Sequence, residues 1–511
     1  MLAISIYNGC CWFNNYTLKC FTVVSIPIIV GMLTTYLKIT TKQINNLIDT
    51  KIMEVNWLMS NKYIYWKEDL KVEKYANGAI KMTVNDNKGY NSIHFKKYYI
   101  INEASLEILL LIDGTKKYDE IVEYLSAKYN ENTESINNKV HKFLDTMFSK
   151  YQIGLDYQKD SIKRNIDMLT GAPIYPSVSS IELTSKCNIK CLHCYGEYNN
   201  TLKDVMPLEK AKSLLKELNN LGVNIIELTG GEITVYPYLL EIVNYALKLD
   251  FQHIALLTNG VAISDDLMNL IINNKERFVV QVDLHSMNDE YLTWFTKVPN
   301  TLERVKNNII KLAENNVFMR VATIITPKNL YELESIADWV HKLGITKYGV
   351  STVLNVGRAK EMGDELLITD GMKLIEIFNK INNKYNNFIQ IIEDGFLSKK
   401  NCGCITSHVT IGANGNIKLC TMDNTKYFNS VIGNVFEESI KDIYDKNADY
   451  INEIFNIDAP KHDSVECNKC ENVVFCSSCI LRGLIKASEL KESCQWYKNK
   501  VSQKIKSKLI I

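Results

Sequence analysis

Fourteen cysteines are distributed unevenly along this chain of 511 residues, and their spacing constrains its fold more than any other feature. Three lie before residue 21, three fall between Cys187 and Cys194, and eight crowd the last quarter, from Cys402 to Cys494. A large, lysine-rich chain without a usual secretion signal does not need disulfides for stability. Clusters with gaps of a few residues are typical of metal ligands in a reducing compartment. We therefore expect a cytoplasmic, metal-binding protein.

The overall composition excludes several classes of protein. The formal net charge is +1, so the chain lacks the excess of lysine and arginine that nucleic-acid or polybasic membrane binding needs. With only 8 prolines and 23 glycines it is neither collagen-like nor of low complexity. A chain of this length should form about two to four domains, each with its own core.

Residues 1–58 contain an uncharged, mostly apolar run from Cys20 to Leu37, which is just long enough to cross a bilayer. More lysines follow the run than precede it, which would keep the rest of the chain cytoplasmic. Two interpretations stay open. The run is a membrane anchor, or translation starts at Met53 or Met59 and the segment is not part of the working protein.

Residues 60–152 are predicted to form a small winged-helix-like domain, because β-prone runs precede three helical patterns. The β-prone runs are Leu70–Tyr75, Ala79–Val84 and Ser92–Phe95, and the helical patterns lie at 106–112, 121–125 and 136–148. Winged helices often bind DNA. Residues 101–152 carry nine acidic residues against six lysines and no arginine, which disfavours that role here.

Strand and helix patterns alternate from residue 175 to 385, which predicts a parallel sheet with helices outside it. Six units are too few for a full eight-fold barrel, so we expect an α/β fold with a partial (β/α)6 TIM-like barrel. Chemistry in such folds lies at the carboxyl ends of the strands. The six expected strands are Ser179–Leu183, Asn224–Leu228, His253–Leu257, Phe278–Leu284, Phe318–Ile325 and Tyr348–Leu354.

Cys187, Cys191 and Cys194 follow the first of these strands within eight residues. Three thiolates can hold three irons of an iron–sulfur cube and leave the fourth iron open to another molecule. A zinc site with His193 as the fourth ligand is the alternative, and the spacing alone leaves both open.

The cysteine loop and its surroundings resemble the radical S-adenosylmethionine (radical SAM) superfamily over about residues 178–360. The loop has the CxxxCxxC spacing of that family, and Gly230-Gly231-Glu232 at the end of the second strand is similar to its GGE motif. The resemblance implies a [4Fe–4S] cluster on the three cysteines and bound S-adenosylmethionine (SAM). It also implies an external one-electron donor of the flavodoxin or ferredoxin type. The two glycines would let backbone groups approach the cofactor.

The fourth strand carries Gln281, Asp283 and His285 on one face, and valine and leucine on the other. Since helices cover the outside of a barrel, the polar face should line the lumen. The family has a polar residue near the ribose of the cofactor at this place, so Asp283 is a candidate cofactor-binding residue. A buried, hydrogen-bonded aspartate without that role is the alternative. No residue is assigned a catalytic role.

Residues 386–511 resemble a SPASM domain, the extension that carries auxiliary [4Fe–4S] clusters in peptide-modifying radical SAM enzymes. Ser477 and Ser478 leave one residue fewer between two of the cysteines than the usual pattern. A pair of zinc ribbons is the alternative. The resemblance implies two auxiliary clusters. The outer one would use Cys467, Cys470, Cys476 and Cys494, and the inner one Cys402, Cys420 and Cys479, while ligation by Cys404 is left open.

The domain at 60–152 is similar to the precursor-recognition element of ribosomally made, post-translationally modified peptide (RiPP) pathways. The run from Ile101 through Asp113-Gly114 to Ile121 carries this similarity. It implies a precursor peptide as partner, whose extended leader would add to an exposed edge strand.

These resemblances together favour a peptide maturase that forms thioether crosslinks from a cysteine sulfur to an α-carbon. Carbon–carbon crosslinking and sulfatase maturation are alternatives within the same family. A zinc-binding winged-helix regulator is an alternative from a different class.

Overall fold

The computed structural model describes residues 4–6, 9–14, 17–19, 62–75, 80–85, 96–150, 153–172, 174–368, 371–385, 388–391, 401–426, 428–476, 479–490 and 493–510. The expected apolar run Cys20 to Leu37 and the expected strand Ser92–Phe95 lie outside these residues. Before that run, β1 (Ile4–Ile6), β2 (Gly9–Asn14) and β3 (Thr17–Lys19) form an antiparallel sheet. Within the described ranges, none of the helices has the length and apolar character that a membrane span requires.

The chain divides into two compact units, and the first ends at Ala172. Its larger sheet has the order β10-β5-β6-β7 and its smaller sheet the order β8-β4-β9. Helices α3 (Glu103–Leu111), α4 (Tyr118–Tyr129) and α5 (Thr133–Asp145) complete the unit. The strands are β4 (Tyr63–Trp66), β5 (Leu70–Tyr75), β6 (Ile80–Asn85), β7 (Lys96–Ile101), β8 (Asp113–Lys117), β9 (Leu155–Gln158) and β10 (Asp167–Ala172).

The three helices and the strands at 70–75 and 80–85 confirm the predicted winged-helix-like unit. The unit also continues beyond the expected boundary at residue 152, because β9 pairs with β4 and β10 pairs in parallel with β5. Helix α3 ends at Leu111 with Ile112 as its C-cap, and Asp113 and Gly114 are the first residues of β8, a strand that the sequence pattern did not indicate. Its residues, Asp-Gly-Thr-Lys-Lys, have little β propensity, so tertiary pairing with β4 determines this strand.

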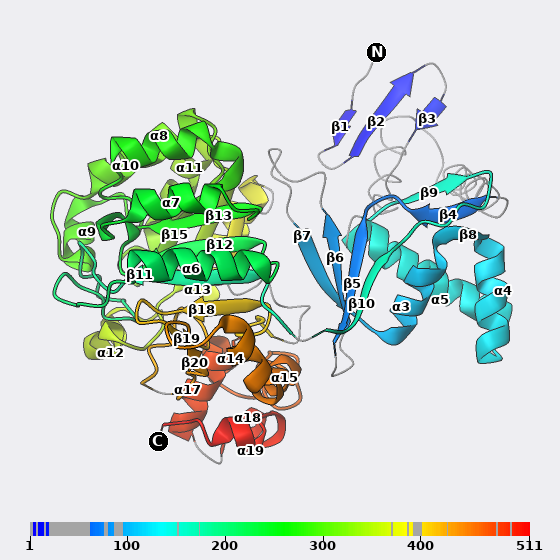
Figure 1. Cartoon of the computed structure of the whole chain (residues 1–511). Helices are drawn as coiled ribbons and strands as arrows, with labels where there is room; N and C mark the ends of the chain where they lie inside the picture. The colour runs from blue at the N-terminus through cyan, green and yellow to red at the C-terminus, as the bar shows by residue number, and fades with distance from the viewer. Residues whose placement is uncertain are drawn as a thin grey trace. The chain divides into compact units, whose positions relative to one another are not determined.

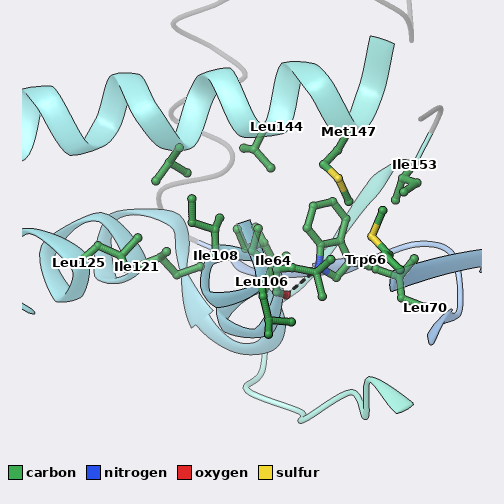
Figure 2. Packing of buried hydrophobic residues seen from close by; sticks show 14 of the residues in the cluster. Ile64, Trp66, Leu70, Leu106, Ile108, Ile121, Leu125, Leu144, Met147 and Ile153 are labelled. Carbon is green, nitrogen blue, oxygen red and sulfur yellow. Dashed lines mark hydrogen bonds between the residues drawn. The ribbon is translucent and has the colours of Figure 1, made fainter. Parts of the chain in front are cut away.

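The core of this unit forms where the inner face of β4 packs on the three helices, as Figure 2 shows. Ile64 and Trp66, two residues apart on β4, are both buried. The indole Nε1–H of Trp66 donates a hydrogen bond of 2.9 Å to the carbonyl oxygen of Leu109 on α3. Leu144, near the end of α5, and Met147, in the π-helical turn Thr146–Lys150 that follows it, pack into the same cluster.

The second unit is built on a parallel sheet with helices on its outer side (Figure 1). The buried face of helix α6 shows why the helices cover the sheet. Its apolar residues recur at helical spacing and are all buried: Ala211, Leu214, Leu215 and Leu218. The barrel strands are β11 (Val178–Thr184), β12 (Ile225–Gly230), β13 (His253–Thr258), β14 (Phe278–Asp283), β15 (Met319–Ile325) and β16 (Lys347–Thr352). The helices include α6 (Leu208–Asn220), α7 (Leu239–Leu247), α8 (Asp265–Asn273), α9 (Asp289–Thr296), α10 (Leu302–Glu314), α11 (Leu333–Lys342) and α13 (Gly371–Tyr385).

The six expected strands are present, and the sheet continues beyond them at both edges. A seventh parallel strand, β17 (Ile389–Ile391), pairs with β16 beyond residue 385, and its three residues are too few to give a period-2 pattern. At the opposite edge, β18 (His408–Ile411) pairs in parallel with β11. The antiparallel strands β19 (Asn416–Lys418) and β20 (Gly433–Asn434) follow, so ten strands form one sheet.

The cysteine-rich C-terminal region therefore continues the barrel sheet. Its helices are α14 (Ile440–Lys446), α15 (Ala448–Asn456), α16 (Val473–Cys476), α17 (Ile480–Leu490), α18 (Gln495–Lys500) and α19 (Gln503–Lys506).

Replacing Trp66 by phenylalanine should destabilise the first unit by about 1–3 kcal/mol, because it removes the buried donor to the Leu109 carbonyl. Amide exchange of peptides from α3 in the full chain measures this local free energy. Tyr124→Phe is the control, since that ring is 45% exposed on α4. Equal exchange rates in the Trp66 variant and the wild type would contradict the assigned role of this hydrogen bond.

Candidate active site

Cys187, Cys191 and Cys194 lie in the loop after β11, at the carboxyl edge of the parallel sheet, as expected. The backbone of the loop is pinned at both ends: the Cys187 N–H donates to Asn199 O (3.1 Å) and the Leu192 N–H to Phe295 O (2.9 Å). Cys187 and Cys191 are buried and Cys194 is partly exposed. A short loop with this many backbone contacts holds the three thiols together.

Burial dominates the electrostatics of these thiols. It raises the pKa of Cys187 to about 12 and that of Cys191 well above its usual value, and the charges of neighbouring thiols add to both shifts. Burial also raises the pKa of Cys194, while the nearby Arg358 guanidinium acts in the opposite direction. The thiols therefore hold their protons at neutral pH, and a bound metal cluster has to displace them.

Arg358, the first residue of α12 (Arg358–Met362), clamps this loop from the other side. Its side chain is buried and donates through Nε to Cys191 O (2.9 Å) and through Nη2 to Tyr198 O (2.9 Å). The preceding Gly357 has φ of +57°, and a Cβ there would lie 2.5 Å from the carbonyl oxygen of Cys194. Glycine is required at this position because the two backbones touch.

Gly230, Gly231 and Glu232 end β12 next to the cysteine loop. A Cβ on Gly231 would lie 2.2 Å from Lys186 O, and one on Gly230, whose φ is +129°, would lie 2.4 Å from Thr184 O. The Gly231 N–H donates to that same Thr184 oxygen at 2.7 Å. These glycines therefore let the ends of β11 and β12 approach closely. Whether they also contact a cofactor stays a prediction.

Glu232 is almost fully buried, and its carboxylate is satisfied by the protein. It accepts hydrogen bonds from the Thr258 hydroxyl (2.7 Å) and from the backbone N–H groups of Thr234 (3.0 Å) and Asn259 (2.7 Å). Burial raises its pKa in spite of these three donors. Glu232 thus ties the end of β12 to the end of β13.

Asp283 lies where the sequence placed it, on the polar face of β14. Val280 and Val282 are fully buried, whereas Gln281 and Asp283 on the opposite face are partly exposed. Gln281 donates to the Asp283 carboxylate (3.2 Å) and accepts from Arg320 Nε (3.0 Å). Burial raises the pKa of Asp283 to about 7. The polar face is present, and contact of Asp283 with a ribose stays a prediction.

His193, the proposed alternative ligand, belongs to an aromatic cluster. Its ring stacks on Phe295 with a centroid distance of 4.8 Å and meets His285 edge-on at 5.3 Å. Burial holds its pKa well below the usual value, so the ring is neutral. Across the described ranges, no three His, Cys, Asp or Glu side chains are arranged to hold a single metal ion.

A second group of thiols consists of Cys402, Cys404, Cys420 and Cys479. The Cys404 thiol is hydrogen-bonded to Cys402, which lowers the pKa of Cys402 and raises that of Cys404. The charges of Cys420 and Cys479 also raise the pKa of Cys404. The structure thus brings Cys404, left open by the sequence, together with the three cysteines expected to form the inner site.

A third group consists of Cys467, Cys470, Cys476 and Cys494, the set expected for the outer site. Burial raises the pKa of Cys476 to about 12, and the charges of the other three thiols add to the shift. Cys467 and Cys470 are joined by a tight turn, in which the Cys470 N–H donates to Cys467 O (2.9 Å). Within each of the three predicted sets, thiols lie close enough to shift one another's pKa, and their ligation stays a prediction.

The residues present fit the groups that the sequence resemblance implies. Soft thiol donors in sets of three and four suit iron–sulfur clusters. One buried side-chain atom, Asn355 Oδ1, has no hydrogen-bond partner among the described residues. It follows the carboxyl end of β16, where a polar group of SAM could satisfy it.

Three family models match separate parts of the chain. Residues 181–340 match the radical SAM superfamily, residues 85–151 match coenzyme PQQ synthesis protein D (PqqD), and residues 402–479 match the SPASM iron–sulfur cluster-binding domain. These matches cover most of the barrel, part of the first compact unit, and every cysteine of the C-terminal region except Cys494.

Several known proteins are similar to this chain. The subtilosin biosynthesis protein AlbA of Bacillus subtilis is 26% identical over 84% of this chain and 95% of its own length. The sporulation killing factor maturation protein SkfB of the same organism is 25% identical over 52% of this chain and 64% of its own length. The crystal structure of Streptococcus suis SuiB bound to SAM covers 86% of this chain and all of that one, with 14% identity and a TM-score of 0.53, and so shares the fold.

The family matches define a SAM-dependent iron–sulfur enzyme. It has a radical SAM domain in its barrel, with a PqqD-like domain before it and a SPASM domain after it. It is an enzyme of the SPASM, peptide-modifying type.

Sequence reasoning missed two arginines at this site. Arg320 lies within the apolar run of β15 and faces the lumen, and a single charge in an apolar strand was the available signal. Arg358 follows Gly357 directly after the last expected strand, but its contact with the cysteine loop spans more than 160 residues of sequence. No local pattern reveals such a contact.

Replacing Gly231 by alanine should separate the ends of β11 and β12, because the new Cβ would lie 2.2 Å from a backbone oxygen. We expect SAM cleavage to fall about tenfold or more, with loss of iron from the first thiol group alone, since interiors transmit such strain locally. Iron content and 5′-deoxyadenosine release after anaerobic reconstitution measure both effects. Gly154→Ala is the control, because its Cβ would meet its nearest neighbour at 3.6 Å. Wild-type cleavage by the Gly231 variant would refute the argument.

Proposed function

We propose that this chain matures a ribosomally made precursor peptide by joining a cysteine sulfur to a backbone α-carbon through a thioether bond. The observation that carries the proposal is where the free cysteines lie along one unit: three in the loop at the barrel edge and eight in the region that continues its sheet. The match to AlbA, a bacteriocin biosynthesis protein, over 95% of that protein's length supports the peptide substrate.

The ligand sets follow from the three groups. Cys187, Cys191 and Cys194 would hold the SAM-binding [4Fe–4S] cluster. The second group, with Cys404 as its fourth member, would hold the inner auxiliary cluster, and the third group the outer one. When bound, SAM and the first cluster supply a 5′-deoxyadenosyl radical, and the auxiliary clusters accept the electron that bond formation releases. An external flavodoxin or ferredoxin would supply electrons to the first cluster.

The residues of the chain provide position and environment. Arg358 and Gly357 fix the cysteine loop, and Glu232 fixes the neighbouring strand ends. Asp283, with its pKa near 7, would accept a hydrogen bond from the ribose hydroxyls or donate one to them. The barrel lumen, lined by Gln281 and Arg320, keeps a polar surface beside the reacting groups.

The first unit would bind the leader of the precursor. Among the described residues β7 ends the larger sheet, while the opposite edge is occupied by β10. Of these two edge strands only β7 lies within the PqqD match, so an added peptide strand would pair with β7, where backbone hydrogen bonds give affinity. The match of residues 85–151 to the PqqD family supports this role. The similar SuiB has been crystallised with its precursor peptide SuiA, which supports a peptide ligand of this kind.

Removing the first unit tests leader binding. Residues 1–172 can be deleted without cutting the larger sheet, because β10 ends at Ala172. We expect processing of the full-length precursor to be lost and slow, uncoupled SAM cleavage to remain, since the second unit holds all three thiol groups. Precursor conversion and 5′-deoxyadenosine are measured by mass spectrometry. Equal conversion with and without the unit would exclude leader binding.

The bond itself is tested by product analysis. Each thioether replaces one C–H and one S–H bond, so the precursor should lose two hydrogens and one alkylatable cysteine per crosslink. A cysteine-containing precursor encoded next to the gene is treated with the reconstituted enzyme, alkylated and analysed by tandem mass spectrometry. The variant with alanine at positions 187, 191 and 194 is the negative control. Loss of hydrogens with every cysteine still alkylated would favour carbon–carbon crosslinking.

A further inference from the structure

A buried polar bridge joins the loop of the first thiol group to the strand that leads to the second. Glu182 on β11 and Lys418 on β19 form an ion pair of 2.7 Å between Oε1 and Nζ, with side chains only 7% and 11% exposed. The hydroxyl of Tyr198 donates to the same Glu182 oxygen at 2.9 Å. Tyr198 follows Cys194 by four residues, and Lys418 precedes Cys420 by two.

The sheet register explains how these residues meet. Ser180 pairs with Thr410, and Thr410 in turn pairs with Lys418, so Lys418 reaches across β18 toward β11. Residues two apart on a strand point to the same face, so Glu182 shares the lumen face of Ser180. A lysine side chain is long enough to span the intervening strand.

Burying the Glu182–Lys418 ion pair carries a free-energy cost, which suggests that the pair has a role. Removing two charges from water costs several kcal/mol per ion, and their attraction offsets this only with good geometry and further hydrogen bonds. Tyr198 supplies such a bond, and burial together with the Glu182 carboxylate raises its pKa, so it remains a neutral donor. Tyr195, whose backbone oxygen accepts from Asn424 Nδ2 (3.2 Å), adds a second contact between the same two segments.

We propose that Glu182, Tyr198 and Lys418 are positioning residues that set the spacing between the SAM-cleaving thiol group and the inner auxiliary group. The inference rests on the proposed function for its catalytic consequence. If the spacing between the two thiol groups is disturbed, a substrate radical would form while the inner auxiliary cluster is out of position to accept its electron. SAM cleavage then continues while crosslinking fails.

The test begins with a readout that needs no substrate. Lys418→Met leaves the Glu182 charge buried and unpaired, so amide exchange in residues 187–199 and 416–424 should accelerate about tenfold or more in the full chain. Tyr198→Phe should accelerate exchange in residues 187–199 alone, because it removes the donor from that loop. The double variant Glu182→Gln with Lys418→Met leaves no unpaired charge and keeps an acceptor for Tyr198, so exchange should return close to wild type.

Lys426→Met is the matched control. Lys426 and Glu197 join the same two segments, but their side chains are 58% and 34% exposed, and exposed pairs contribute little. Its exchange should equal that of the wild type. If Lys418→Met also leaves exchange unchanged, or the double variant exchanges as fast as the single one, the positioning role is wrong.

The catalytic arm measures 5′-deoxyadenosine formed per crosslink with a cysteine-containing precursor encoded next to the gene. Lys418→Met should raise this ratio about tenfold, at wild-type iron content, and the double variant should lower it again. An unchanged ratio together with faster exchange would overturn the proposed role in coupling. Failure of the wild-type enzyme to crosslink would count against the proposed function. The positioning role of Glu182, Tyr198 and Lys418 would then be tested by the amide-exchange measurements alone.

Discussion

The parallel pairing of β18 with β11 is the constraint on which the arrangement of the second unit depends. The backbone N–H groups of Ser177 and Val178 both donate to Ser407 O, at 2.9 and 3.0 Å, and fix the register at the start of the pairing. A slip of one residue would turn every side chain of β18 to the opposite face. The turn that carries Cys402 and Cys404 immediately precedes β18, so the register of this strand also places the inner thiol group.

The barrel was predictable because its signal is local. Each strand is a short apolar run, and each helix repeats its apolar residues at a spacing of three or four, so both follow from neighbouring residues. Several strands of the first unit were missed, among them β4 and β7, although both contain β-prone residues. Strands β8 and β17 were missed because they are short or lack β-prone residues, and pairing with a distant strand decides their conformation. The continuation of the sheet through β18 was missed for the same reason, since no periodic pattern encodes a partner strand far away in sequence.

The sequence predicted the candidate ligands of the site better than the residues that hold those ligands in position. Cysteine spacing and the resemblance to the GGE and SPASM motifs indicated eleven thiols and their division into three sets, and in the structure thiols of each set shift one another's pKa. The residues that hold those groups, such as Arg358 and Lys418, are ordinary charged residues in the sequence. Their function comes from contacts across the fold, so only the structure identifies them. Glu232 shows the converse case, in which a motif residue is occupied by hydrogen bonds to the protein itself.

The pairing of β11 with β18 also has a consequence for biosynthesis. The two strands are about 230 residues apart, as the bond between Ser177 and Ser407 illustrates. On the ribosome, β11 is made first among the barrel strands, yet its outer edge stays unpaired until residue 411 has emerged. Cys479 and Cys494 emerge later still. The expected thiol groups of the C-terminal region are therefore complete only after residue 494 has been made, well after the barrel strands. Until then the cell has to protect an unpaired strand edge from aggregation.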